Sequence, residues 1–246
     1  MSALQGDQAL AQTPHIAAFE FYKALARAQG RAHWLLILLV VFALTNFAAG
    51  GAATSQQYLQ QRIAAGEKLS GEAAERSAAK VPGYGVLRAG LFIVTGIVWL
   101  LWLHRSYGLL RFLGTKVTRF SPGWAVGCWF VPFVNLVRPY QIVKELRLRS
   151  RNLNATAEPA PQLAGEVTAL WWLTWLAANV TEVLYAALLW SAETPADIIR
   201  ADKTGFAGDN LEAAAALLAI YLVRQIRNAQ KLATFPAIPP VTPPVA

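Results

Sequence analysis

Four long apolar runs constrain this chain more than any other feature of its sequence. The first run, 34–53, contains LLILLVVFAL and no charged residue, and the third, 170–190, has aromatic residues at both ends. A helix of about 20 residues is needed to cross the apolar core of a bilayer, which is about 30 Å thick. We therefore predict an all-α integral membrane four-helix bundle, with spans at about 34–53, 86–103, 170–190 and 211–223.

The composition supports a membrane location and disfavours a nucleic-acid partner. Of the 246 residues 55% are hydrophobic and only 15% are charged, whereas soluble domains carry about 25% charged residues. The net charge of +8 is spread beside the apolar runs and does not form one basic domain, as a nucleic-acid-binding protein would require. Membrane lipids are therefore the expected partners, with a protein partner or a homo-oligomer as further possibilities.

A fifth apolar stretch, 121–141, differs from the four runs because its helix is interrupted. It reads SPGWAVGCWFVPFVNLVRPYQ and contains Gly123 and Pro132. A helix from Trp124 to Val137 would cover only about 20 Å, which is too short to cross the apolar core. Pro132 also removes a backbone donor and clashes with the preceding helical turn. We predict a re-entrant or interfacial helical segment that turns near Pro132.

The placement of Lys and Arg predicts the orientation of the spans, because cytoplasmic loops collect cationic residues. Basic residues lie before span one, after span two and after span four, whereas the loop after span three is net acidic. Both termini are therefore expected in the cytoplasm. If 121–141 also crossed, Arg138 and the basic residues after it would violate this pattern.

The remaining stretches divide the chain into three regions. Residues 1–33 are predicted to be a cytoplasmic N-terminal amphipathic segment, residues 34–232 the membrane domain, and residues 233–246 a Pro-rich disordered tail. Within the membrane domain, 54–85 and 191–210 are predicted polar loops, with Gly50 and Gly51 at the end of span one. The fourth span is the shortest and contains Glu212.

A motif in the middle of the chain resembles a known family. WLHRSY at 102–107 followed by 121–141 resembles the DUF4328 family, bacterial multi-pass membrane proteins of unassigned function. The matching positions are Arg105, Tyr107, Pro122, Gly123, Trp124, Pro132, Asn135, Leu136, Arg138, Pro139 and Tyr140. The match covers roughly residues 98–150, and Leu109 and Cys128 stand where the family often has Asn and Trp. The resemblance implies a membrane domain, in a multi-pass protein of a bacterial inner membrane, and supplies no activity.

The end of the motif offers a guanidinium, a phenol and an amide at a membrane boundary. Arg138, Tyr140 and Gln141 could bind a phospholipid or another anion, because Arg grips phosphate with paired donors. Alternatively they form an interfacial anchor, with Pro139 starting the next helix. Arg105 and Tyr107 are expected on the same side of the membrane as Arg138 and could join either arrangement.

The aromatic residues of the interrupted segment allow two interpretations. Trp124, Trp129, Phe130 and Phe133 could line a pocket for an apolar molecule. They could equally serve as packing or as an aromatic belt at the membrane surface.

Glu182 lies inside the third run, about 12 Å from its end at Trp190. An intramembrane carboxylate is costly and is by default a functional hypothesis. Asn46 in span one falls at a similar depth in the predicted topology. One hypothesis is a protonated, hydrogen-bonded Glu182 that holds spans one and three together; the other is proton or ion handling.

No catalytic or metal-binding motif is present. His15, His33 and His104 are scattered and lack partners at ligand spacing, and Cys128 is the single cysteine. We expect no metal, no cofactor and no catalytic residue. The primary functional hypothesis is a non-enzymatic membrane platform that binds lipid or a protein partner on the cytoplasmic face. The alternatives are a small oligomeric transporter or channel using Glu182, and a lipid-acting membrane enzyme.

Overall fold

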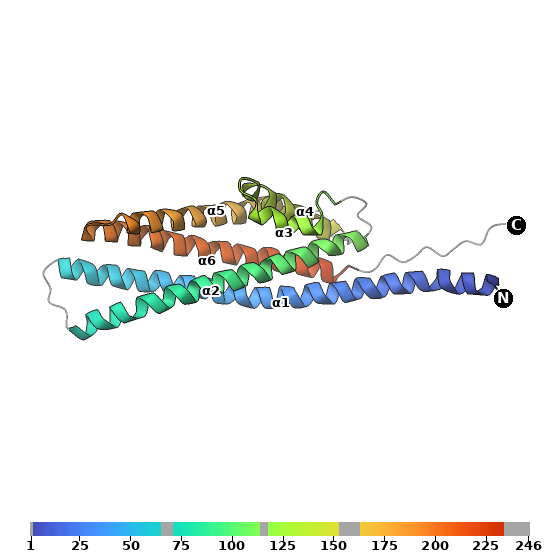
Figure 1. Ribbon diagram of the computed structural model, residues 1–246, viewed down its shortest axis with the longest axis horizontal. Coiled ribbons are helices and arrows are strands. Elements are labelled where there is room, and N and C mark those ends of the chain that lie inside the picture. The colour runs from blue at the N-terminus through green and yellow to red at the C-terminus, as the bar shows by residue number, and fades with distance from the viewer. Residues whose placement is uncertain (1, 65–70, 114–117, 153–162, 234–246) are drawn as a thin grey trace. The chain divides into compact units, whose positions relative to one another are not determined.

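The regular elements of the computed structural model are all helical in the part of the chain that it describes, residues 2–64, 71–113, 118–152 and 163–233. The long helices, labelled in Figure 1, are α1 (Ser2–Ala64), α2 (Gly71–Leu109), α4 (Arg138–Asn152), α5 (Leu163–Trp190) and α6 (Pro195–Lys231). The short elements are η1 (Leu110–Leu113), α3 (Pro122–Gly127), η2 (Cys128–Phe130) and η3 (Val134–Leu136). The predicted fold class is confirmed, including the extra helical segment between the second and third spans.

Four helices are long and apolar enough to cross a membrane. The candidate spans are Ile16–Ala49, Gly85–Leu109, Glu166–Trp190 and Ala196–Lys231. Large apolar side chains on them are exposed, among them Phe47 at 69% and Val183 at 72%. Surfaces of this kind are unfavourable in water and are satisfied by lipid. The chain is therefore a membrane protein with four candidate spans, the number that the sequence predicts.

The helices α1 and α2 extend well into the interval predicted to be a polar loop, 54–85. Helix α1 continues through Gly50 and Gly51 to Ala64, and α2 already begins at Gly71. A glycine costs a helix only about 1 kcal/mol relative to alanine, so two glycines do not end a helix with strong helix formers on both sides. The N-terminal segment 1–33 is likewise part of α1 over its described residues and does not form a separate short helix.

The predicted loop 191–210 is wrong over most of its length, because α6 begins at Pro195. Thr194 and Asp197 cap this helix reciprocally: the Thr194 Oγ1 accepts from the Asp197 amide at 3.3 Å, and the Asp197 Oδ2 accepts from the Thr194 amide at 3.1 Å. Such a capping box, followed by Pro at the first helical position, is a strong helix start. The short fourth run is therefore part of a 37-residue helix.

The chain forms two compact units. The first consists of Met1–His33, Leu100–Pro159 and Gln225–Ala246, and the second of Trp34–Trp99 and Ala160–Arg224. Helices α1, α2 and α6 contribute residues to both units. Residues 153–162 of the predicted linker and 234–246 of the predicted tail lie outside the described residues.

The first unit packs parts of α1, α2, α4 and α6 around buried aromatic and aliphatic side chains. Phe21 is fully buried and meets the Phe112 ring edge-on at 6.3 Å. Buried polar groups also connect the helices: the Gln230 amide donates to the Ser106 carbonyl at 3.0 Å and to the Ser150 hydroxyl at 3.2 Å. This unit carries the interrupted segment.

The second unit brings the remaining parts of α1, α2, α5 and α6 together. Phe42 of α1 meets Phe92 of α2 at a ring distance of 6.1 Å, and Trp99 of α2 meets Trp171 of α5 at 5.3 Å. Aromatic pairs at these distances add to the energy of burial. They hold α2 against α1 and against α5 along this part of its length.

Candidate functional site

The interrupted segment lies in the first unit and is built from three short helical turns. Its first turn, α3, is capped by Ser121, whose Oγ accepts from the Trp124 amide at 3.1 Å, and has Pro122 at its start. The helix is broken between η2 and η3, where Phe133 has a φ of 62°. A positive φ is rare for a residue with a bulky side chain. The predicted break near Pro132 is confirmed.

A network centred on Tyr107 and Glu145 fixes the chain that enters this segment. The Tyr107 hydroxyl donates to Glu145 Oε2 at 2.7 Å and accepts from the Phe120 amide at 3.2 Å. The other oxygen, Glu145 Oε1, accepts from the Arg119 amide at 2.9 Å and from Arg149 Nε at 2.6 Å. Tyr107 is 1% exposed. This phenol therefore joins α2, α4 and residue 120, while Glu145 also holds residue 119, and the two side chains together position the segment.

Arg138 and Tyr140 lie at the first turn of α4. The Arg138 Nη1 donates to Gln141 Oε1 at 2.9 Å, and its guanidinium lies 5.5 Å from the centre of the Phe120 ring. The Lys144 ammonium lies over the Tyr140 ring at 5.5 Å. Pro139 is buried at the second position of α4, a place in the first turn that suits proline. As predicted for an anchor, Pro139 stands at the start of the next helix.

The outer surface of the segment is apolar and exposed, and we name it the crest. Phe133 is 85% exposed and Phe130 is 72% exposed, so these two rings point outward and do not line an enclosed pocket. The crest consists of Trp124, Phe130, Val131, Phe133, Leu136 and Val137, all at least 37% exposed. Beneath it, Ala125 and Cys128 are fully buried, and burial raises the pKa of the Cys128 thiol to about 11.

The other motif residues have less distinct environments. Arg105 is exposed on α2 and belongs, like Arg138, to the first unit. Gly123 is exposed and has open space around its Cα. The Asn135 side-chain oxygen is buried and has no hydrogen-bond partner among the described residues. That Arg105 and Arg138 share one side of the membrane remains a prediction.

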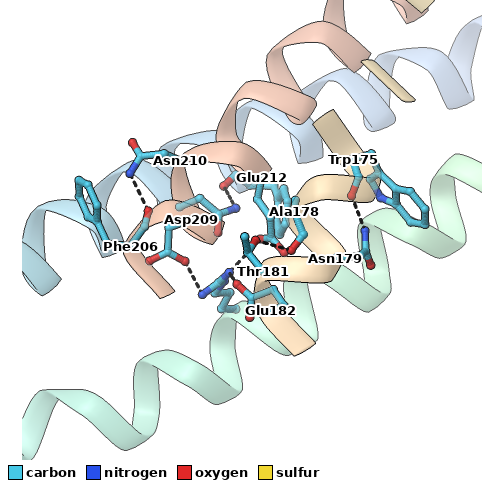
Figure 2. A network of polar contacts seen from close by, with 12 residues as sticks. Trp175, Ala178, Asn179, Thr181, Glu182, Phe206, Asp209, Asn210 and Glu212 are labelled. Atoms are coloured by element: carbon cyan, nitrogen blue, oxygen red, sulfur yellow. Dashed lines mark hydrogen bonds and ion pairs between the residues drawn. The ribbon is translucent and has the colours of Figure 1, made fainter. Parts of the chain in front are cut away.

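The second unit contains a different kind of polar site, in which one arginine binds three carboxylates. Arg88 of α2 contacts Glu182 Oε1 at 2.7 Å and Glu212 Oε2 at 3.0 Å through Nη2. Its Nη1 contacts Asp209 Oδ1 at 2.5 Å. Figure 2 shows Glu182 of α5 directed toward Asp209 and Glu212 of α6. We name these four residues the ion cluster; its side chains are only 8–32% exposed.

Two glycines of α6 allow α5 to approach closely at the ion cluster. A Cβ added to Gly208 would lie 3.0 Å from Glu182 Oε1 and 3.1 Å from Thr181 Oγ1. A Cβ added to Gly205 would lie 3.1 Å from the Tyr185 ring. Small residues at helix contacts permit such close backbone approach in membranes. The glycines thus place the α5 carboxylate within reach of the same guanidinium as the α6 carboxylates.

The ion cluster corrects the prediction for Glu182. This carboxylate is not isolated, because Arg88 of the second span binds it. The expected link between spans one and three does not form through Asn46, whose Nδ2 donates to the Phe42 carbonyl of its own helix at 2.9 Å. The Asn46 Oδ1 is buried and has no partner among the described residues. Arg88 contacts Glu182 where one of the two hypotheses had a hydrogen bond to span one, since the guanidinium offers several donors to carboxylates.

Four of the residues that form these sites were not identified as site residues from the sequence. Arg88 stands two residues after the start of the predicted second span. A cation in one apolar run and carboxylates in other runs together indicate an intramembrane ion pair, so the sequence did contain a signal for Arg88. Asp209 and Glu212, three residues apart, share a helix face once α6 is known to include them. Glu145 is the one carboxylate in 118–152 and stands four residues before Arg149, a favourable helix pairing.

In the described ranges, no group of three or more His, Cys, Asp or Glu residues is arranged to hold a metal ion.

No curated protein and no solved structure matches the chain. The sequence profile described as "Domain of unknown function (DUF4328)" matches residues 65–228. That match contains both the motif segment and the ion cluster and covers well over half of the chain. The chain therefore belongs to the DUF4328 family.

Proposed function

We propose that this protein is a non-enzymatic membrane platform whose crest binds lipid or a protein partner at the cytoplasmic face of a bacterial inner membrane. The observation that carries this proposal is the crest itself, an apolar surface displayed by a chain that is rigidly held from behind. An exposed apolar patch of this kind marks an interaction site. In the proposed topology both termini lie in the cytoplasm.

The polar motif residues support a role in binding more than one in catalysis. Tyr107 and Glu145 are engaged with each other and with backbone amides of residues 119 and 120. Arg138 is engaged with Gln141 and the Phe120 ring. Tyr107 and Glu145 act on the chain that precedes the crest, so their chemistry is used to position it.

Photo-crosslinking in cells tests the platform directly. A benzophenone amino acid replaces Phe130 or Phe133, with Lys231, exposed in the same unit, as the matched control position. We expect the crest positions to give lipid adducts or one discrete protein adduct at a yield well above that of the control. Equal yields at the crest and at position 231 would contradict the proposal.

A second candidate function, a small oligomeric transporter or channel using Glu182, is favoured by the ion cluster. One guanidinium faces three carboxylates, so the site carries formal negative charge in excess when all are ionised. Ionisable groups within spans commonly mark ion or proton pathways. Four helices enclose little space, so a path through the membrane would require more than one copy.

Flux measurements separate the two candidates. Purified protein in liposomes carrying an internal pH dye is compared with the variants Glu182→Gln and Glu166→Gln, the latter altering an exposed carboxylate at the start of α5. The transporter hypothesis expects proton or cation flux that Glu182→Gln abolishes and Glu166→Gln leaves intact. Flux that is absent, or unchanged in Glu182→Gln, would remove the second candidate.

A further inference from the structure

We propose that the partner of the crest is an anionic bilayer surface, with Phe130 and Phe133 inserted below the headgroups and basic residues at headgroup level. This inference rests on the proposed function and names the partner of that same site. If the crest binds the bilayer, any protein partner would have to bind a surface other than the crest.

The composition of the crest matches a bilayer interface. Residues 124–137 contain no Asp, Glu, Lys, Arg or His, so this surface offers no charged side chain that could pair with a protein partner. The exposed side chains include Trp124, Phe130 and Phe133, and aromatic residues are enriched where membrane meets water. Four other helices of the chain are long and apolar enough to cross a membrane, so this segment belongs to a chain that is itself held in a bilayer.

The backbone at Phe133 also indicates an external contact. Phe133 has a φ of 62° and a side chain that is 85% exposed. A bulky residue in this backbone region is strained, and the exposed ring gains almost no burial within the chain that would offset the strain. Insertion of the ring into the acyl region would supply that burial.

The rim of the crest is basic. Residues 118–152 contain six basic side chains and a single carboxylate, Glu145, which Arg149 already pairs. In contrast, Arg119, Arg138 and Lys144 form no ion pair with the described residues. Basic residues beside an apolar surface favour anionic lipid, since the charges attract the headgroups while the apolar residues insert. This charge complementarity selects an anionic leaflet over a neutral one.

The segment is held in one shape, as an inserting element should be. Ser121 caps α3, Phe120 is bonded to Tyr107, and Arg119 is bonded to Glu145. Its buried side consists of Ala125, Cys128 and the start of α4. Since the polar backbone entering the turn is already satisfied, the rings can insert without exposing these amides to lipid.

Spin-label depth measurement on the full-length protein tests the inference. A nitroxide is attached at Phe133→Cys, Phe130→Cys or the control Lys231→Cys, each in a Cys128→Ala background, in nanodiscs of phosphatidylcholine with or without phosphatidylglycerol. Collision with oxygen and with a water-soluble nickel chelate gives the depth of each label. We expect oxygen to dominate at both crest positions and nickel at position 231, with deeper crest labels when phosphatidylglycerol is present.

Variants of the rim test the anionic preference separately. Arg138→Gln with Lys144→Gln should abolish the depth difference between the two lipid compositions while leaving both crest labels below the headgroups. Crest labels that the nickel chelate reaches in both lipid compositions would overturn insertion. Equal label depths in the two compositions, measured on the protein with Arg138 and Lys144 unaltered, would overturn the anionic preference. If either result overturns the lipid inference, a discrete protein adduct at the crest in the photo-crosslinking experiment would still support the platform. Equal crosslinking yields at the crest and at position 231 would instead remove both the platform and the lipid inference.

Discussion

The Glu145 network of the first unit and the ion cluster of the second use the same chemistry in opposite proportions. In the first, one carboxylate receives donors from Tyr107, Arg149 and a backbone amide. In the second, one guanidinium donates to three carboxylates. The first is charge-balanced by its own helix partner and stabilises a local turn. The second would carry negative charge in excess with all three carboxylates ionised, and it connects three helices, so its loss should have wider consequences.

The largest effect is expected from Arg88→Gln. This change leaves three poorly exposed carboxylates without their shared cation, and breaking a buried ion pair costs about 3–5 kcal/mol. Reversible unfolding in detergent micelles should show a decrease of about this size in the free energy of unfolding. The exposed Arg224→Gln serves as the control; equal stability of the two variants would show that the cluster does not hold the helices together.

Glu145→Gln should have a smaller effect, of about 1–3 kcal/mol. It weakens charge-assisted bonds to Arg149 and to the Arg119 amide, yet the amide side chain still accepts hydrogen bonds. The comparison is with Glu20→Gln, which alters an exposed pair with Lys23 and should change stability by about 1 kcal/mol or less. A double-mutant cycle with Tyr107→Phe should give a coupling energy different from zero; strict additivity would contradict the network.

Gly208→Ala tests whether close approach of α5 and α6 is needed for the ion cluster. The added methyl would meet Glu182 Oε1 at 3.0 Å, and such overpacking costs about 1–3 kcal/mol. Gly90→Ala is the matched control, because nothing lies within 4 Å of its added Cβ and alanine favours a helix by up to about 1 kcal/mol. The same unfolding assay should separate them; a stabilised Gly208→Ala would show that the contact is loose.

The smallest expected effect concerns Cys128, which reports on the packing beneath the crest. Burial raises the pKa of its thiol to about 11 from 9.0, so the reactive thiolate is scarce at neutral pH. The folded state therefore favours the protonated thiol, a preference present below pH 9 and lost as pH rises through about 11. Maleimide labelling at pH 7 should be far slower than at Lys231→Cys, and denaturant should equalise the two rates. Rapid labelling of the folded protein would show that the segment opens.

The number of spans and the interruption of 121–141 follow from local properties of the sequence. Hydropathy identifies apolar helices because each must satisfy its own backbone within lipid, and Pro132 limits a helix wherever the chain places it. Both predicted loops were too long. Gly50 and Gly51 suggested the end of a helix, but strong helix formers on both sides continue α1. The acidic residues near Asp209 suggested a loop, but capping at Thr194 starts α6 before them.

The sequence by itself determined that this is an all-helical membrane protein, with four apolar runs and one interrupted segment of the DUF4328 type. Only the tertiary structure decided which polar groups meet. Arg88 and Glu212 are 124 residues apart, and Tyr107 and Glu145 are 38 apart. Local backbone preferences are encoded by neighbouring residues, whereas the partner of a charge is decided by which helix faces pack together. Gly208 shows the difference: in sequence it is a weak helix former, and in the fold it makes room for Glu182.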